Sequence, residues 1–200
     1  MLTLLLLIAS FVLGLATKLG ISDNLALPLL FNLSVFFSSI TFGISVYVYS
    51  NYENKKHILK SAKDKKERFL YTLHHTLVSF CFLYVGIVMA LLFHAFDEKF
   101  VFYDLSIHYI AIGFIGITIA SYLPMMLAPI LGKPISVNGF YRVPLILIII
   151  SLLARTVGVV HISYFNGHGF TLLQALTSTS GFLILLAIVL FIALMYKSIK

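Results

Sequence analysis

The chain has 200 residues, of which 60% are hydrophobic and only 10% are charged, and its mean hydropathy is +1.05. Soluble domains carry about 25% charged residues, so this composition excludes a soluble globular protein and predicts an all-α membrane protein. The net charge of +7 comes largely from residues 51–69, which hold seven Lys or Arg residues. Because this segment is short and flanked by apolar runs, we interpret it as a cytoplasmic loop rather than a surface for nucleic acid or anionic lipid.

Six apolar runs approach the length of about 20 residues that a bilayer span needs. In chain order, the predicted helices cover residues 2–19, 25–49, 70–95, 106–131, 143–164 and 171–196. The first run lacks the positively charged start of a secretory signal, so we expect a retained helix, with a cleaved signal peptide as the alternative. The sequence therefore predicts a six-transmembrane-helix bundle that forms one domain over residues 1–200.

Polar segments separate the predicted helices. Asp104 is expected to cap the fourth helix, and residues 132–142 (GKPISVNGFYR) form a loop by composition. On these boundaries every Asp and Glu falls in a loop or at a helix end. That argues against a proton or sodium transporter that depends on a carboxylate in the middle of the membrane.

The distribution of Lys and Arg sets the orientation, because short cytoplasmic loops carry an excess of these residues. With residues 51–69 inside, Lys133, Arg142 and the C-terminal lysines also fall inside. Eleven of the fourteen Lys and Arg residues then lie on the cytoplasmic side, two lie outside, and Arg155 lies within the membrane. The sequence therefore predicts that both termini are cytoplasmic (N-in/C-in).

Arg155 is the most informative charged residue, because it falls inside a predicted membrane span. A guanidinium that faces lipid costs at least ~3 kcal/mol, so we expect Arg155 to face a partner inside the bundle. Since no carboxylate falls inside a predicted helix, the expected partner is a haem propionate or another anion. His94, His108 and His161 fall near the outer ends of three predicted helices. With Arg155 they predict a cofactor or metal site in the outer half, to which His168 is a further candidate.

Imidazole suits iron, copper and zinc, and helical bundles bind such cofactors between facing helices. The sequence has no CxxCH attachment motif, so a haem would be of the b type. A copper or zinc site built from His94, His108 and His161 is the alternative. The single cysteine, Cys81, excludes an intrachain disulfide and a cysteine-based metal cluster.

His74 and His75 predict a second, inner site near the cytoplasmic face. Adjacent residues on a helix point about 100° apart, so at most one of the two is expected to face a ligand. Met125 and Met126 fall at a similar depth and could supply a thioether, although methionine more often serves in packing. Gly113, Gly116 and Ala120 are expected to let a neighbouring helix approach closely.

Part of the chain resembles a known family. The stretch from His108 to Gly116 (HYIAIGFIG), the Leu-Gly-Lys-Pro segment at 131–134 and a following helix with Leu-Leu-Ala-Arg155 are similar to the repeated region of the NnrS membrane proteins. The resemblance spans residues 105–155. It implies a half-length, six-helix relative of a haem- and copper-containing family linked to nitric-oxide metabolism or stress. It also implies that His108 is a haem or metal ligand and that Arg155 is its electrostatic partner.

Taken together, the sequence predicts a membrane haem protein for electron transfer or small-gas binding, with copper as a further cofactor. It would reside in the plasma membrane of a prokaryote, as a homodimer or as a subunit of a larger respiratory or oxidase-like complex, without a nucleic-acid partner. The rival interpretation is a non-redox scaffold subunit whose histidines only anchor helices at the membrane surface.

Overall fold

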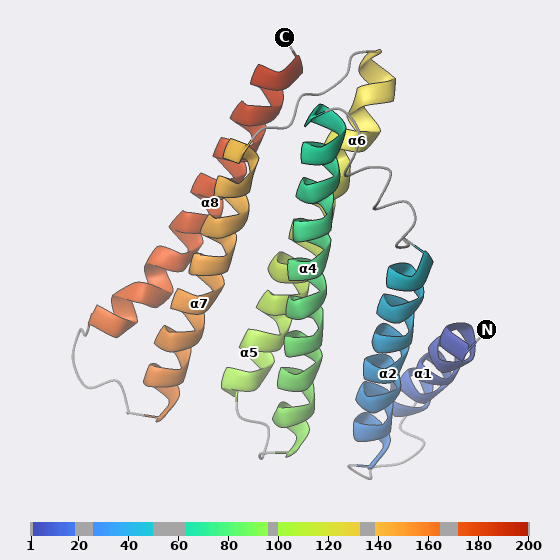
Figure 1. Cartoon of the computed structure of the whole chain (residues 1–200). Helices are drawn as coiled ribbons and strands as arrows, with labels where there is room; N and C mark the ends of the chain where they lie inside the picture. The colour runs from blue at the N-terminus through green and yellow to red at the C-terminus, as the bar shows by residue number, and fades with distance from the viewer. Residues whose placement is uncertain are drawn as a thin grey trace.

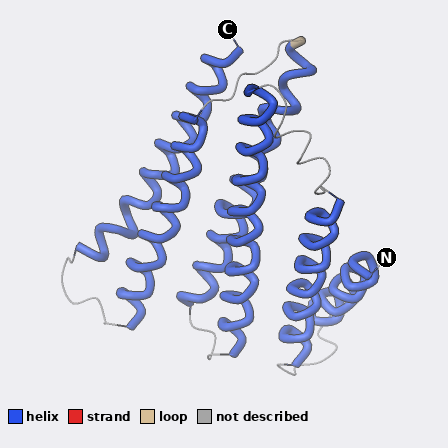
Figure 2. Tube along the Cα trace, viewed as in Figure 1, coloured by secondary structure: helices blue, strands red, loops and turns tan. Residues whose placement is uncertain are grey.

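The computed structural model describes residues 2–18, 26–49, 63–95, 100–132, 139–164 and 172–199, and these segments are helical almost throughout (Figure 1; Figure 2). The helices are α1 (Leu2–Lys18), α2 (Ala26–Tyr49), α4 (Lys63–Ala95), α5 (Phe100–His108), the π-helical η1 (Tyr109–Gly116), α6 (Ile117–Leu131), the short 3-10 turn η2 (Gly139–Tyr141), α7 (Arg142–Tyr164) and α8 (Leu172–Ile199). The segments α5, η1 and α6 follow one another without a break and form one long helix. No strand occurs within this part of the chain.

Four helical stretches are long and apolar enough to cross a membrane. They are Lys66–Phe93, Phe100–Leu127, Arg142–Tyr164 and Ala175–Lys197. Two shorter apolar helices, Leu2–Ala16 and Pro28–Ile44, precede them. An all-helical chain with four helices that are long and apolar enough to span a membrane is therefore confirmed, whereas the six-span bundle and its orientation stay predictions.

Two predicted helix starts were wrong, and both helices begin earlier. α4 begins at Lys63 instead of residue 70, so the end of the basic segment is helical. Lys, Glu and Arg are good helix formers and can extend a span beyond the apolar region. α5 begins at Phe100, which places Asp104 a full turn inside the helix and not at its cap.

The helices form three neighbouring groups (Figure 1). α1 and α2 form a hairpin, and α2 lies beside α4. α4 packs along the continuous helix α5–η1–α6, and α7 pairs along its length with α8. The main buried core lies between the second and third groups. Its fully buried members are Val101, Leu105, Tyr109, Ile117, Leu145, Ile148, Leu152 and Ala187.

Two glycines allow α4 to pack closely against α5 and η1. A Cβ at Gly113 would lie 2.6 Å from Cβ and Cγ of Phe82, and a Cβ at Gly86 would lie 2.7 Å from Cγ1 of Ile110. The packing role predicted for Gly113 is confirmed. Gly116 makes no such approach, because its nearest neighbour would be the Ala111 carbonyl at 3.6 Å.

Candidate functional site

Arg155 on α7 is paired with Asp104 on α5. Its Nε donates to Oδ2 of Asp104 at 3.1 Å, and Nη2 donates to Oδ1 at 2.8 Å. The two side chains are only 22% and 12% exposed. This is the bidentate geometry that makes an Arg–carboxylate pair both strong and specific.

The ion pair corrects the expectation that Arg155 lacks a carboxylate partner. The sequence placed Asp104 at a helix end because the apolar run was taken to begin after it. The apolar residues from Phe100 to Tyr103 instead form the first turn of α5. Asp104 therefore lies in the stretch Phe100–Leu127, which is long and apolar enough to span a membrane, and the long arginine side chain reaches it from α7.

His108 follows Asp104 by one helical turn. Its Nδ1 lies 2.7 Å from the Asp104 carbonyl oxygen and 3.5 Å from Oδ1 of the same residue. A carbonyl oxygen only accepts, so Nδ1 carries the hydrogen and Nε2 of the neutral ring keeps its lone pair. The ring is 27% exposed. Asp104, His108 and Arg155 thus gather into one polar group, which we call the outer cluster.

A second polar contact supports the same helices. The hydroxyls of Tyr109 on η1 and Thr156 on α7 are hydrogen-bonded to each other. Thr156 also donates to the Leu152 carbonyl at 2.7 Å. Tyr109 and Thr156, which directly follow His108 and Arg155 in the sequence, therefore hold α7 against η1. They extend the outer cluster with neutral polar groups.

The other residues predicted for the outer site are His94, His161 and His168, and of these only His161 has a described side chain. His161 is half-buried on α7. It follows Arg155 by six residues, so it points about 120° away from it around the helix. The backbone of His94 belongs to α4, but its side chain and the whole of His168 lie outside the described residues.

A metal site of three or more ligands is not formed by the described side chains. Among them, no group of three or more His, Cys, Asp or Glu residues could hold a metal ion. Because the side chain of His94 is not described, the copper or zinc site of His94, His108 and His161 stays a prediction.

The inner pair of histidines divides as expected for adjacent residues on a helix. His74 is exposed, whereas His75 is only 2% exposed. Nδ1 of His75 donates to the Tyr71 carbonyl at 2.8 Å, and the two rings lie 3.9 Å apart at 44°. In the neutral ring this hydrogen bond leaves the lone pair on Nε2, the arrangement typical of a histidine that binds a metal.

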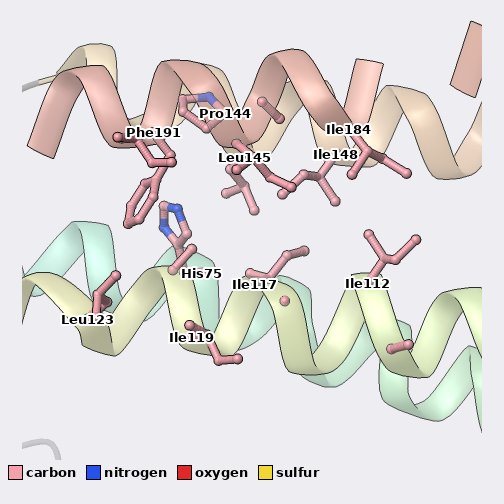
Figure 3. A pocket seen from close by; sticks show the side chains of 16 residues that line it. His75, Ile112, Ile117, Ile119, Leu123, Pro144, Leu145, Ile148, Ile184 and Phe191 are labelled. Carbon is pink, nitrogen blue, oxygen red and sulfur yellow. The ribbon is translucent and has the colours of Figure 1, made fainter. Parts of the chain in front are cut away.

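His75 contributes to the wall of an apolar cavity of about 390 Å³. Figure 3 shows its ring in the space between α6 on one side and α7 and α8 on the other, close to Phe191. His75 is the one titratable side chain in the wall; the rest is aliphatic, Phe191 and Pro144. The main contributors beside Phe191 are Ile112, Ile117, Leu145, Ile148 and Ile184. A cavity of this size falls in the range of small-molecule and cofactor sites.

Aromatic residues and one arginine lie close to His75 without being part of the cavity wall. Tyr71, Tyr141 and Met195 form a small buried cluster there, and the rings of Tyr71 and Tyr141 meet edge to face at 6.0 Å. Arg142, the next residue on α7, is exposed and within electrostatic reach of His75. An anionic group bound beside His75 would therefore find a cation within electrostatic reach.

The two methionines proposed for the inner site do not belong to it. Met125 and Met126 are exposed and are not among the residues of the cavity wall. Met125 instead accepts a long hydrogen bond of 3.9 Å from Thr72. Their position on α6 turns them away from the gap into which His75 points.

A haem fits the inner site better than the outer cluster. The inner site offers a buried imidazole nitrogen, apolar walls and a nearby arginine. In the outer cluster the Nε–Nη2 edge of Arg155, which could bind a propionate through two hydrogen bonds, is already bound to Asp104. The candidate functional site is therefore the cavity at His75.

Comparison with protein-family models, with curated proteins and with solved structures finds no match for the chain. The resemblance to the NnrS family stays a prediction that rests on the residues quoted from the sequence.

Proposed function

We propose that this chain is an integral membrane protein that binds a b-type haem in the cavity at His75, for electron transfer or for binding a small gas. The observation that carries the proposal is the state of His75. It is buried, its Nδ1 is bound to the Tyr71 carbonyl at 2.8 Å, and its ring faces an apolar cavity. A histidine held in this way would offer the lone pair of Nε2 to the haem iron.

The walls of the cavity suit a flat apolar molecule. Ile117, Leu145 and Ile148 belong to the buried core, so they hold a fixed shape and exclude water. When bound, a haem supplies an iron centre that can change its oxidation state or bind a diatomic gas. The protein would hold it through His75 and without a covalent bond, because the only cysteine, Cys81, does not line the cavity.

Arg142 is the residue that we assign to the haem carboxylates. It is exposed at the start of α7, two residues before Pro144 in the cavity wall. A guanidinium can bind a carboxylate through two parallel hydrogen bonds. Arg142 thus takes the role of propionate partner that was expected of Arg155 from the sequence.

We also propose that the chain crosses the membrane six times with both termini in the cytoplasm of a prokaryotic cell. The described basic residues support this orientation. Lys66 and Arg68 lie in the first two turns of α4, Arg142 begins α7 and Lys197 lies in the last turn of α8, and these helix ends lie at the same end of the bundle (Figure 1). Assembly as a homodimer or within a larger complex stays a prediction.

A scaffold role is the second candidate, and the Asp104–Arg155 pair favours it. A charge that is already neutralised by a carboxylate does not require a cofactor nearby. In that case the outer cluster would serve only to fix α5 against α7, and the purified protein would contain no haem.

The visible spectrum tests the proposal. The protein is purified in mild detergent, and difference spectra are recorded between the dithionite-reduced and the oxidised forms. We expect haem bands in the wild-type protein and their loss in His75→Ala. His74→Ala is the matched control, because this neighbour is exposed, and it should retain them. Full haem content in His75→Ala would contradict the proposal. Loss of haem in His108→Ala but not in His75→Ala would place the site at the outer cluster instead.

A further inference from the structure

We infer that Tyr71 is the positioning residue of the His75 site, through three separate contacts that fix both the ligand and the wall of the cavity. The inference rests on the function proposed above, because it concerns the same site. Tyr71 lies one turn before His75 on α4 and is only 3% exposed.

The first contact compensates for a proline in α6. In an α-helix the N–H of residue i bonds to the carbonyl of residue i−4, so the Ala120 carbonyl would pair with residue 124. Residue 124 is proline and has no N–H. The Tyr71 hydroxyl instead donates to the Ala120 carbonyl at 2.8 Å. This bond satisfies, inside a membrane-spanning stretch, a group that would be costly to leave unpaired.

The second and third contacts act on His75 itself. The Tyr71 carbonyl accepts the Nδ1 hydrogen at 2.8 Å, which sets the tautomer. The Tyr71 ring packs on the imidazole at 3.9 Å, which limits its rotation. Both Ala120 and His75 line the cavity. One residue therefore joins the ligand on α4 to the part of the cavity wall that α6 forms.

Tyr71→Phe removes only the hydroxyl and tests the link to α6. We expect haem affinity to fall roughly tenfold, the scale of one buried carbonyl left without its partner. The haem midpoint potential should shift as well, because the ligand and the wall are no longer held together. Tyr141→Phe is the matched control. Tyr141 lies in the same buried cluster, but its hydroxyl donates to the Leu194 carbonyl at 2.9 Å on α8, so the potential should stay unchanged.

A second substitution should rescue the first. Pro124→Ala restores the N–H that the Ala120 carbonyl lacks, so the Tyr71 hydroxyl becomes dispensable. We expect Tyr71→Phe/Pro124→Ala to bind haem with nearly the wild-type affinity and potential. A general loss of stability would not be corrected in this way. If the losses of haem affinity in Tyr71→Phe and in Pro124→Ala simply added in the double variant, the inference would be overturned.

A distance measurement on the haem-free protein separates this inference from the proposed function. Spin labels are attached through Leu77→Cys on α4 and Met126→Cys on α6, both exposed positions, in a Cys81→Ala background. The distance distribution should broaden in Tyr71→Phe and narrow again when Pro124→Ala is added. An unchanged distribution in Tyr71→Phe would overturn the role of Tyr71. A wild-type protein without haem would instead overturn the proposed function.

Discussion

At the scale of single residues, Arg155 depends on one carboxylate. Asp104 accepts two hydrogen bonds from it, at 2.8 and 3.1 Å, and both side chains are largely buried. A buried charge that loses its partner is strongly destabilising, whereas replacing both charges by apolar groups is often neutral. The pair therefore fixes α5 against α7 more than it contributes net stability.

A double-mutant cycle tests this pair. Asp104→Leu alone leaves the arginine charge unpaired, and we expect the free energy of unfolding to fall by about 3 kcal/mol. Asp104→Leu/Arg155→Leu should cost less than either single change. Helicity followed during an SDS titration in mixed micelles measures the effect. If the two losses in the free energy of unfolding added in the double variant, the two side chains would not interact. Loss of haem from the double variant would return Arg155 to the cofactor site.

At the scale of elements, the long helix α5–η1–α6 has an irregular middle. Tyr109–Gly116 is π-helical, a form that is rare in proteins and frequent at functional sites. The segment begins directly after His108 of the outer cluster. It contains Gly113, which allows Phe82 to approach, and Gly116, which lines the cavity. One irregular segment thus connects the outer cluster, the packing against α4 and the candidate site.

Two glycines of this segment give a matched pair of substitutions. A Cβ at Gly113 would lie 2.6 Å from Phe82, whereas a Cβ at Gly116 would have its nearest neighbour at 3.6 Å. We expect Gly113→Ala to lower the free energy of unfolding by about 1–3 kcal/mol, because α4 must move away. Gly116→Ala should be neutral or slightly stabilising, since alanine favours a helix. Equal effects in the same SDS titration would contradict the close packing of α4 on η1.

At the scale of the whole molecule, charge is distributed unevenly between the two ends of the bundle. The described cations Lys66, Arg68, Arg142 and Lys197 lie where α4 and α7 begin and α8 ends (Figure 1). The outer cluster lies toward the other end, where α4 ends and α5 begins. A bilayer between these ends would meet the positive-inside rule with the basic end in the cytoplasm.

A reporter enzyme attached after Lys200 tests the orientation. At this position we expect a reporter that is active only in the cytoplasm to be active, and a reporter that is active only outside the cytoplasm to be inactive. A second fusion at residue 98, between α4 and α5, should give the opposite result. A C-terminal reporter that is active outside would contradict the proposed orientation of α8.

The sequence by itself determined the class of the protein and the approximate position of its helices. The bilayer is the reason, because it demands long apolar runs and confines charge to their ends, and both features are local in the chain. The predicted helices therefore agree with α2, α7 and α8 to within a few residues at each end. The errors occurred at Lys63, where the helix extends past the apolar region, and at Phe100, where it includes the apolar residues before Asp104.

Only the tertiary structure decided what the polar residues do. The sequence indicated that Arg155 needs a partner, but Asp104 lies 51 positions away and meets it only because α5 packs on α7. Likewise, the sequence indicated that one of His74 and His75 faces inward, and the rotation of α4 selected His75. The cavity is formed by residues of α4, η1, α6, α7 and α8, which are far apart in the chain. Such features depend on helix rotation and on contacts between distant segments, and apolar periodicity alone does not specify them.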